Sequence, residues 1–292
     1  MDYRLKVFCC VADLQSISAA AKKLRISQPA VTQHIKMLEE SYSCTFFLRS
    51  RTGVSLTEAG ATLLGYARRI AALDEEVATK LRNPESHLGG HLRLGVSTTI
   101  IQYYLPKVLA EFKQRHAAVS IQVVESNSMG VISALLAQRI DIGLIESPCR
   151  RRDLRAESFF DDEIVVIISP GDPLAKKRFI GIEEFSRQSF VFRELGSGTR
   201  QCFEESLQRL KMNIKKLSIV QEFSSTETIK RAVAEGMGLG FVSRISITNE
   251  LANGSLSILK VRGLEIRRHF STILPLGPDP VGLRQVFLTF LR

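Results

Sequence analysis

Apolar residues in the first part of the chain recur at helical spacing. They mark one face of a helix close to the start and one face of a second helix further along. The residues on these faces are Leu5, Phe8, Val11 and Ala12 in the first case and Val31, Ile35 and Leu38 in the second. Between the two faces, the alanine-rich segment 19–24 predicts a short helix with small side chains.

Pro29 interrupts a stretch that otherwise has the composition of a continuous helix. Proline inside a helix removes a hydrogen bond and costs about 3 kcal/mol, but it is well tolerated in the first turn. Ser27 is a suitable N-cap for a helix that starts at this point. The segment therefore predicts two short helices joined by a tight turn at Arg25 and Ile26, which is a helix-turn-helix.

The outer side of the second of these helices is polar, and its residue types suit DNA. Gln pairs with adenine, Ala and Thr methyl groups contact the thymine methyl group, and Lys reaches phosphate or guanine. Two β-like runs, 46–48 and 54–56, then predict a hairpin whose basic tip can reach the DNA backbone or the minor groove. The candidate DNA-binding residues are Ser27, Gln28, Pro29, Ala30, Thr32, Gln33, Lys36, Arg49, Arg51 and Thr52. A plain helical hairpin with a solvated face and a surface hairpin with ordinary arginines are the alternatives.

Thr57 predicts the start of a long helix with coiled-coil spacing. The apolar seam of this helix consists of Leu63, Tyr66, Ile70, Leu73 and Val77. The seam could pack on its own domain, but beside a DNA-binding unit it favours pairing with a second copy, which would present two recognition helices to two half-sites. The segment 83–91 has the composition of a linker.

From residue 91 onward, strand patterns alternate with helix patterns. The alternation predicts parallel sheets with right-handed crossovers, hence an α/β fold behind an α-rich N-terminal domain. The expected strands are 91–97, 119–126, 140–146, 163–169, 189–194, 217–223 and 238–243, and the expected helices are 103–116, 130–139, 199–211 and 227–235. Ligands of such sheets bind beyond the carboxyl ends of the strands.

Hydroxyl and amide side chains follow four of the expected strands, at the starts of helices. Helix starts with free backbone N–H groups favour anions. The candidate effector-binding residues are Ser97, Thr98, Thr99, Asn127, Ser128, Ser197, Gly198, Thr199, Ser225 and Thr226. These short segments contain no acidic residue that would repel an anion. The alternative is that the Ser and Thr residues are only helix N-caps.

Composition narrows the class of protein only slightly. With 292 residues and 45% hydrophobic residues, the chain has material for two or more domains with real cores. No apolar run reaches about 18 residues, so no membrane span is expected, and the start of the chain lacks a signal-peptide pattern, so a cytosolic protein is expected. The net charge of +10 is compatible with a nucleic acid partner but is spread along the chain.

Catalytic and metal-binding patterns are not found in the sequence. The five cysteines, at positions 9, 10, 44, 149 and 202, lack metal-ligand spacing and are expected to be reduced thiols, with a redox role for Cys149 or Cys202 as the alternative. The "GSGTR" segment is not a phosphate-binding Walker loop, and the histidines are scattered. We therefore expect neither an enzyme nor a cofactor. A solute-binding protein or enzyme domain with a helical N-terminal extension is the alternative class.

Three segments resemble a known family. "AAKKLRISQPAVTQHIKMLEE", "FFLR" and "LTEAG" are similar to the N-terminal signature of LysR-type transcriptional regulators. The stretch "ESYSCTFF" departs from that signature, which usually has a Gly and a Pro-containing turn before the wing. The resemblance implies a bacterial, ligand-responsive regulator of transcription with a winged helix-turn-helix, a linker helix and an effector domain like periplasmic binding proteins.

The resemblance also implies a domain plan. It comprises a DNA-binding domain at 1–57, a dimerising linker helix and hinge at 58–90, and an effector domain at 91–292. The effector domain would split into one subdomain of about 91–161 plus 268–292 and another of about 162–267, with crossing strands near 159–162 and 264–270. The implied partners are promoter DNA, a small anionic effector and further copies of the chain in a homodimer or homotetramer. "VSTTI" and "FRELGSGTR" resemble the branch that senses sulfur- and carbon-assimilation metabolites, which are small oxyanions or phosphorylated sugars. The implied effector is an oxyanion, a carboxylate or a phosphorylated metabolite.

Overall fold

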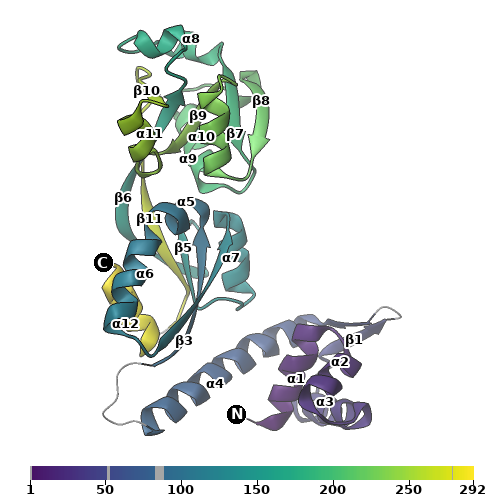
Figure 1. The fold of residues 1–292 in the computed structure, drawn as a ribbon. Coiled ribbons are helices and arrows are strands. Elements are labelled where there is room, and N and C mark those ends of the chain that lie inside the picture. Colours follow the sequence, from purple (N-terminus) through teal and green to yellow (C-terminus); the bar gives the residue numbers. More distant parts are fainter. Residues whose placement is uncertain (1, 51–52, 83–88, 278) are drawn as a thin grey trace. The chain divides into compact units, whose positions relative to one another are not determined.

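The chain folds into two compact units, residues 1–86 and 87–292 (Figure 1). The structure is a computed structural model that describes residues 2–50, 53–82, 89–277 and 279–292. No helix among these residues is long and apolar enough to cross a lipid bilayer. The two units are described separately.

The first unit packs its helices and a β-hairpin around one small core. Its elements are α1 (Tyr3–Leu14), α2 (Ile17–Leu24), α3 (Gln28–Tyr42), β1 (Phe47–Ser50), β2 (Gly53–Leu56) and α4 (Glu58–Arg82). Phe8 lies at the centre, with its ring 5.6 Å from that of Phe46 and 5.2 Å from that of Phe47. The apolar faces predicted for α1 and α3 are buried in this core, except that Ala12 is only partly buried.

The turn between α2 and α3 has the predicted form. Ser16 Oγ accepts a hydrogen bond from the Ala19 N–H at 3.2 Å, so α2 begins two residues earlier than predicted. Arg25 ends α2 in the left-handed region at φ 57°. Ser27 Oγ then accepts from the Ala30 N–H at 3.3 Å, and Pro29 lies in the first turn of α3. The proline therefore starts a helix, as predicted.

The hairpin is an antiparallel pair that runs from Phe47↔Leu56 to Ser50↔Gly53. The loop before the hairpin, where the sequence departs from the family signature, is held by contacts with the end of α3. Ser43 ends α3 in the left-handed region at φ 52°, and Glu39 Oε1 accepts from the Phe46 N–H at 2.7 Å.

The second unit is a two-subdomain α/β structure built on one mixed sheet (Figure 1). The strands are β3 (Gly90–Ser97), β4 (Val119–Ser126), β5 (Ile142–Ile145), β6 (Leu154–Ile168), β7 (Ser189–Arg193), β8 (Ser218–Phe223), β9 (Leu239–Ser243), β10 (Ser257–Leu259) and β11 (Ile266–Pro275). The α-helices are α5 (Thr98–Tyr103), α6 (Leu105–Arg115), α7 (Ser128–Leu136), α8 (Ile182–Ser186), α9 (Gly198–Arg209), α10 (Thr226–Ala234), α11 (Thr248–Asn253) and α12 (Leu283–Leu291). Short 3-10 helices, η1 (Pro173–Lys176), η2 (Ile214–Lys216) and η3 (Arg244–Ile247), complete the unit.

Parallel pairing was the right prediction within each subdomain. Strand β3 pairs in parallel with β4 and β5, and β7 pairs in parallel with β8 and β9. The prediction was wrong for the two long strands, because β11 runs antiparallel to β5 and β6, and β6 runs antiparallel to β9. The reason is that β6 and β11 carry the chain from one subdomain to the other and back, as Figure 1 shows. The crossings expected near 159–162 and 264–270 overlap these strands.

A β-bulge marks the crossing. Phe270 is opposite Phe160 while Ser271 is opposite Ser158, so Phe159 is an extra residue in β6. A bulge bends a strand and changes where its side chains point. The rings of Phe159 and Phe160 both reach Tyr104, at centroid distances of 5.4 Å and 4.9 Å.

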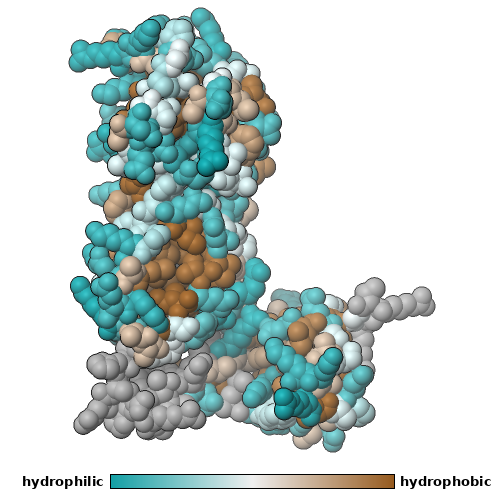
Figure 2. Space-filling view, in the orientation of Figure 1, coloured by the Kyte–Doolittle hydropathy of each residue, from teal (hydrophilic) through white to brown (hydrophobic). Residues whose placement is uncertain are grey.

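Each subdomain has its own apolar core. One core gathers around β3, β5 and the C-terminal helix α12. The other contains a group of aromatic rings in which Phe203 and Phe241 stack at a centroid distance of 3.5 Å. Figure 2 shows apolar side chains gathered most densely, on the visible face, over the lower of the two subdomains of this unit.

Candidate DNA-binding surface and effector cleft

Helix α3 separates an apolar face from a polar one. Val31, Ile35 and Leu38 are buried in the core of the first unit. On the other side, most of the predicted DNA-binding residues are exposed, and Ala30 and Thr32 are partly buried. The exposed residues are Ser27, Gln28, Pro29, Gln33 and Lys36. Lys36 forms a loose ion pair with Glu40 at 3.6 Å, which leaves its ammonium group largely in solvent.

The hairpin beside this helix carries the other predicted DNA contacts. Arg49 lies in β1, where its backbone is paired with that of Val54. Arg51 and Thr52 lie outside the described residues. Contacts from the hairpin to DNA therefore stay a prediction from the sequence.

Helix α4 exposes most of the predicted apolar seam. Tyr66, Ile70, Leu73 and Val77 have exposed fractions of 58%, 42%, 53% and 54% in the single chain. Leu63 differs from them, because it packs against the core of the first unit. The exposed part of the seam therefore begins after Leu63.

The predicted effector-binding segments lie at helix starts in the second unit. Ser97 precedes α5, Asn127 precedes α7, Ser197 precedes α9 and Ser225 precedes α10. All four are N-cap residues, and three of them cap the helix through the side chain: Asn127 Oδ1 accepts from the Gly130 N–H at 2.9 Å, and the hydroxyls of Ser197 and Ser225 accept from backbone N–H groups at 3.5 Å and 3.4 Å. For these residues the cap alternative describes the contacts that are present.

Three other predicted hydroxyl groups do not form a hydrogen bond that caps a helix. The Oγ atoms of Ser97 and Ser128 and the Oγ1 atom of Thr99 are buried without a hydrogen-bond partner in the described part of the chain. Buried polar groups are nearly always hydrogen-bonded in folded proteins. The cap alternative therefore does not account for these three hydroxyl groups. Thr98 between them is buried as well.

The segments from the two subdomains meet. Asn127 Nδ2 donates to Glu194 Oε1 and to the Leu195 carbonyl oxygen, both at 3.3 Å. The Met129 N–H donates to the Gly196 carbonyl oxygen at 3.3 Å. Helix α7 of one subdomain thus contacts the loop before α9 of the other, and this line of contact between the subdomains is called the cleft below.

Charged residues in this cleft were not among the predicted site residues. Arg268 on β11 binds Asp162 through Nε at 2.7 Å, Glu146 through Nη2 at 2.9 Å and Thr199 Oγ1 through Nη1 at 3.0 Å. All three charged side chains are almost completely buried. The predicted segments themselves contain no acidic residue, but Glu146, which follows the end of β5, and Asp162, on the crossing strand β6, bring two carboxylates to Arg268 beside Thr199. The position of Glu146 could have been predicted, since it too lies beyond a strand's carboxyl end.

A second charged pair ties α10 to the site. Arg193 is buried at the end of β7 and donates from Nη1 to Thr226 Oγ1 at 3.0 Å. It also pairs with Glu194 at 2.9 Å, the residue that accepts from Asn127. Thr226 is therefore connected to the cleft through Arg193 and Glu194, whereas Ser225 serves as the cap of α10.

Another contact between the subdomains joins α5 to α10. The Tyr103 hydroxyl donates to Glu227, and the buried Lys230 pairs with Glu227 and Glu250, each at 2.7 Å. Burial, together with the hydrogen bond to Glu227, raises the pKa of Tyr103 well above its usual range. Tyr103 is consequently a neutral hydrogen-bond donor near neutral pH and holds the two subdomains together.

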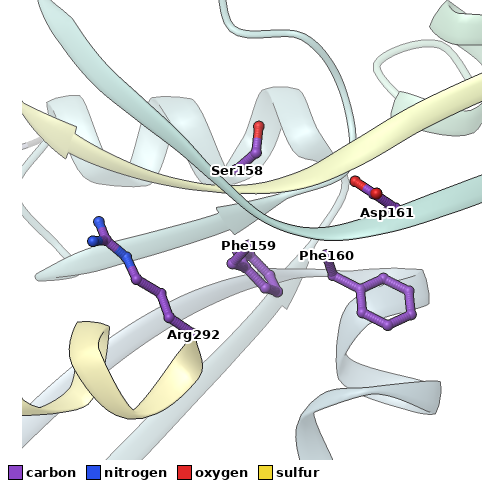
Figure 3. Close-up of a pocket in the computed structure, with 5 residues that line it drawn as sticks. All are labelled: Ser158, Phe159, Phe160, Asp161 and Arg292. Atoms are coloured by element: carbon purple, nitrogen blue, oxygen red, sulfur yellow. The ribbon is translucent and has the colours of Figure 1, made fainter.

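None of the ten predicted residues lines either of two cavities in this unit, although Arg268, which donates to Thr199 Oγ1, lines the larger one. The smaller, of about 470 Å³, is lined by Ser158, Phe159, Phe160, Asp161 and Arg292. Figure 3 shows the rings of Phe159 and Phe160 on one side of β6 and Ser158 on the other. The larger, of about 800 Å³, is lined in part by Cys149, Arg150, Cys202, Arg209 and Arg267. Cys149 and Cys202 therefore line the same cavity.

We expect Cys202 to react slowly with thiol reagents. Burial raises its pKa to about 11, so at pH 7 it is a thiol, and the thiolate is the reactive form. In timed alkylation with iodoacetamide followed by mass spectrometry, the exposed Cys44 should be modified first and Cys202 last. If Cys202 were alkylated as fast as Cys44, the result would support the alternative that Cys202 has a redox role.

Comparison with known proteins gives consistent matches along the chain. The family described as "Bacterial regulatory helix-turn-helix protein, lysR family" matches residues 3–61, and the "LysR substrate binding domain" matches residues 85–292. The RuBisCO operon transcriptional regulator of Allochromatium vinosum is 33% identical over 94% of this chain and 89% of its own length. The transcriptional activator CmpR of Synechocystis sp. is 31% identical over 99% of this chain and 94% of its own.

Solved structures agree with this result. The regulatory domain of Synechocystis CcmR, in complex with 2-PG, is 30% identical and superposes with a TM-score of 0.63 over 69% of this chain and 95% of that domain. Full-length OxyR of Pseudomonas aeruginosa, at 20% identity, shares the fold with a TM-score of 0.75 over 99% of this chain and 92% of its own. The relatives are named as regulators of transcription, which argues against the enzyme and solute-binding alternatives. The chain belongs to the LysR family of transcriptional regulators.

Proposed function

We propose that the cleft of the second unit binds a small anionic metabolite and that binding changes how paired recognition helices hold promoter DNA. The buried hydroxyl groups of Ser97, Thr99 and Ser128, which lack a hydrogen-bond partner among the described residues, are the main support for a ligand at this place. Hydroxyl donors and helix starts suit an anion. A ligand held between two subdomains can shift a population between two arrangements, provided it binds one of them better.

Within this function, DNA binding is assigned to residues 1–57, pairing of copies to 58–90 and effector binding to 91–292. The ligand class rests on two supports, the donors in the cleft and the 2-PG held by the related CcmR regulatory domain. Oxyanions, carboxylates and phosphorylated metabolites fit this description. Since the partner is chromosomal DNA, the working compartment is the cytoplasm.

Gln33→Ala is expected to weaken binding to a specific site by about 1–3 kcal/mol and to leave binding to unrelated DNA unchanged. Gln33 is exposed on the polar face of α3, where an amide can pair with an adenine edge. Lys36→Ala serves as the matched control, because loss of a phosphate contact should weaken both kinds of binding and reduce the salt dependence by about one contact. Fluorescence anisotropy with one specific and one unrelated DNA duplex, at several salt concentrations, measures the two affinities and their salt dependence. An equal loss on both duplexes for Gln33→Ala would rule out base recognition by this residue.

Ser128→Ala is expected to weaken effector binding without weakening the fold. Its hydroxyl has no partner in the described chain, so removing it costs no internal hydrogen bond there. A hydrogen bond to a charged ligand contributes about 1.5–3 kcal/mol, so affinity should fall roughly 10- to 150-fold. A thermal-shift screen of sulfate, phosphate, phosphate esters and small carboxylates identifies a binding anion, and calorimetry then compares the variant with Ser133→Ala, an exposed serine on the same helix. Unchanged affinity in the Ser128 variant would remove this residue from the site.

Pairing of copies through α4 is the assembly that the exposed seam supports. Apolar side chains at coiled-coil spacing on a helix surface are covered when two such helices meet. A dimer formed in this way would place two copies of α3 on two half-sites of DNA. Two such dimers would give the homotetramer that the family resemblance implies.

A further inference from the structure

Most of the buried polar atoms that lack a hydrogen-bond partner among the described residues belong to segments around the cleft, while Glu250 Oε2 lies elsewhere, beside Lys230. Beside the three hydroxyls of Ser97, Thr99 and Ser128, the Oε1 atom of Glu146 has no hydrogen-bond donor there, whereas its Oε2 atom lies 2.9 Å from Arg268 Nη2. Each of these four residues has at most 2% of its surface exposed. An unsatisfied buried oxygen of a charged group costs more free energy than a neutral one, so Glu146 Oε1 is the atom of this group for which a missing donor costs most.

These residues form one cluster. Strands β3 and β5 are parallel neighbours with Val96 opposite Leu144, so Ser97, the last residue of β3, and Glu146, the residue after β5, lie at the same edge of the sheet. A Cβ atom placed on Gly198 would lie 2.7 Å from Glu146 Cγ and 2.7 Å from Ser128 Oγ. The backbone at the start of α9 therefore covers Glu146 and Ser128 together.

The charge at this place is not that of a simple anion site. The guanidinium group of Arg268 pairs with two carboxylates, those of Asp162 and Glu146. Arg268 Nη2 lies 2.9 Å from Glu146 Oε2 as an ion pair, while Oε1 of the same carboxylate is buried without a donor in the described chain. An anion that offers only acceptors would bring further negative charge against that oxygen. A ligand that also donates a hydrogen bond would satisfy it.

We infer that the effector is an anion that also carries a hydroxyl group, and that Glu146 selects it by accepting a hydrogen bond from that hydroxyl. The hydroxyls of Ser97, Thr99 and Ser128 donate to the acidic group of the ligand, and Glu146 Oε1 receives the ligand's own O–H. This inference rests on the proposal that the cleft is the effector site. It narrows the ligand class from small anions to hydroxylated anions, such as hydroxy acids and their phosphate esters.

Matched ligands that differ by one hydroxyl test the inference on the unmodified full-length protein. One pair is 3-phosphoglycerate and 3-phosphooxypropionate, and an unphosphorylated pair is lactate and propionate. Calorimetry is run at pH 8, where a phosphate ester with a second pKa of about 6 has lost its proton and cannot itself donate to Glu146. The hydroxylated member of a pair should bind about 10- to 150-fold more tightly. Equal affinity within each pair would overturn the role of Glu146.

A substitution tests whether Glu146 is the residue that causes the preference for the hydroxylated ligand. Glu146→Gln removes the charge but keeps the size, so the preference for the hydroxylated ligand should fall below about tenfold while the ligand without the hydroxyl binds more tightly than it does to the unmodified protein. Glu205→Gln is the matched control, since Glu205 lines the larger cavity beside Arg150 and should leave both affinities unchanged. A preference that survives in Glu146→Gln would also overturn the inference. Binding of neither member of either pair would count against the inference and against the proposed effector site together.

Discussion

Arg268→Met is expected to destabilise the second unit by about 3–5 kcal/mol. The guanidinium of Arg268 lies between Glu146 at 2.9 Å and Asp162 at 2.7 Å, with all three side chains almost fully buried. Removing it leaves two carboxylates in a site that water cannot reach, and breaking a buried ion pair from one side has a cost of this size. For a unit of this length the midpoint of thermal unfolding should fall by roughly 6–20 °C, measured by circular dichroism.

Two further variants separate charge from packing. Arg267 is the neighbouring residue, with a side chain that is 86% exposed and a long contact of 3.9 Å to Glu265, so Arg267→Met should leave the unfolding midpoint unchanged. Adding Glu146→Gln and Asp162→Asn to Arg268→Met removes the uncompensated charges and should restore part of the lost stability. If the triple variant is no more stable than Arg268→Met, the loss comes from packing and the electrostatic explanation is wrong.

Ile70→Asp combined with Leu73→Asp is expected to abolish pairing through α4 and, with it, tight binding to a two-half-site operator. Both residues are exposed in the single chain, at 42% and 53%, so the substitutions should not unfold the first unit. In a paired helix they would place charges against apolar partners without compensation, which costs several kcal/mol per chain. Light scattering should show a smaller assembly, and gel shifts should show a loss of operator affinity much larger than the loss on a single half-site.

The matched control places the same two charges elsewhere on the helix. Ala61→Asp with Thr62→Asp alters exposed positions near the start of α4, outside the exposed part of the seam. Acidic residues near a helix start are favourable, so mass and operator affinity should be unchanged. An unchanged mass in the Ile70 and Leu73 variant would mean that the seam does not pair copies of the chain.

The helix-turn-helix could be predicted almost in full from the sequence, because its signals are local. Ser27, Pro29 and the Val31 face fix the start and orientation of α3 within a few residues, and the structure has the same cap and the same buried face. The hairpin and the cap of α4 at Thr57 depend on equally short signals, and Thr57 Oγ1 accepts from the Gly60 N–H at 2.9 Å.

The effector cleft could be predicted only in part, because its charged members come from distant segments. Ser97, Thr99 and Ser128 follow strand ends, and the rule that ligands lie there locates them. Arg268 and Asp162 meet because β6 and β11 pair antiparallel across the crossing, with Arg268 opposite Asp162. Strand composition alone does not give that register, so the sequence predicted neither the buried ion pairs nor the antiparallel direction of these strands.

The short elements α5 and α12 were missed for a related reason. Helix α5 has six residues and follows β3 directly, so its periodicity is too short to separate it from α6. Helix α12 packs through Phe287, Leu288 and Leu291 into the core that gathers around β3 and β5, although it lies far from those strands in sequence. Its role in that core follows from tertiary packing.

Selection of binding sites from random DNA by the full-length protein, repeated with and without the anion identified by calorimetry, tests the central claim most directly. A ligand-responsive regulator should enrich two related half-sites whose centres are about 10 base pairs, or a multiple of that spacing, apart. The anion should then change the affinity for the enriched DNA, or the length protected in a footprint, and Ser128→Ala should lose this response while keeping the same half-sites. The account would be contradicted if no sequence were enriched, or if the bound anion left affinity and footprint unchanged.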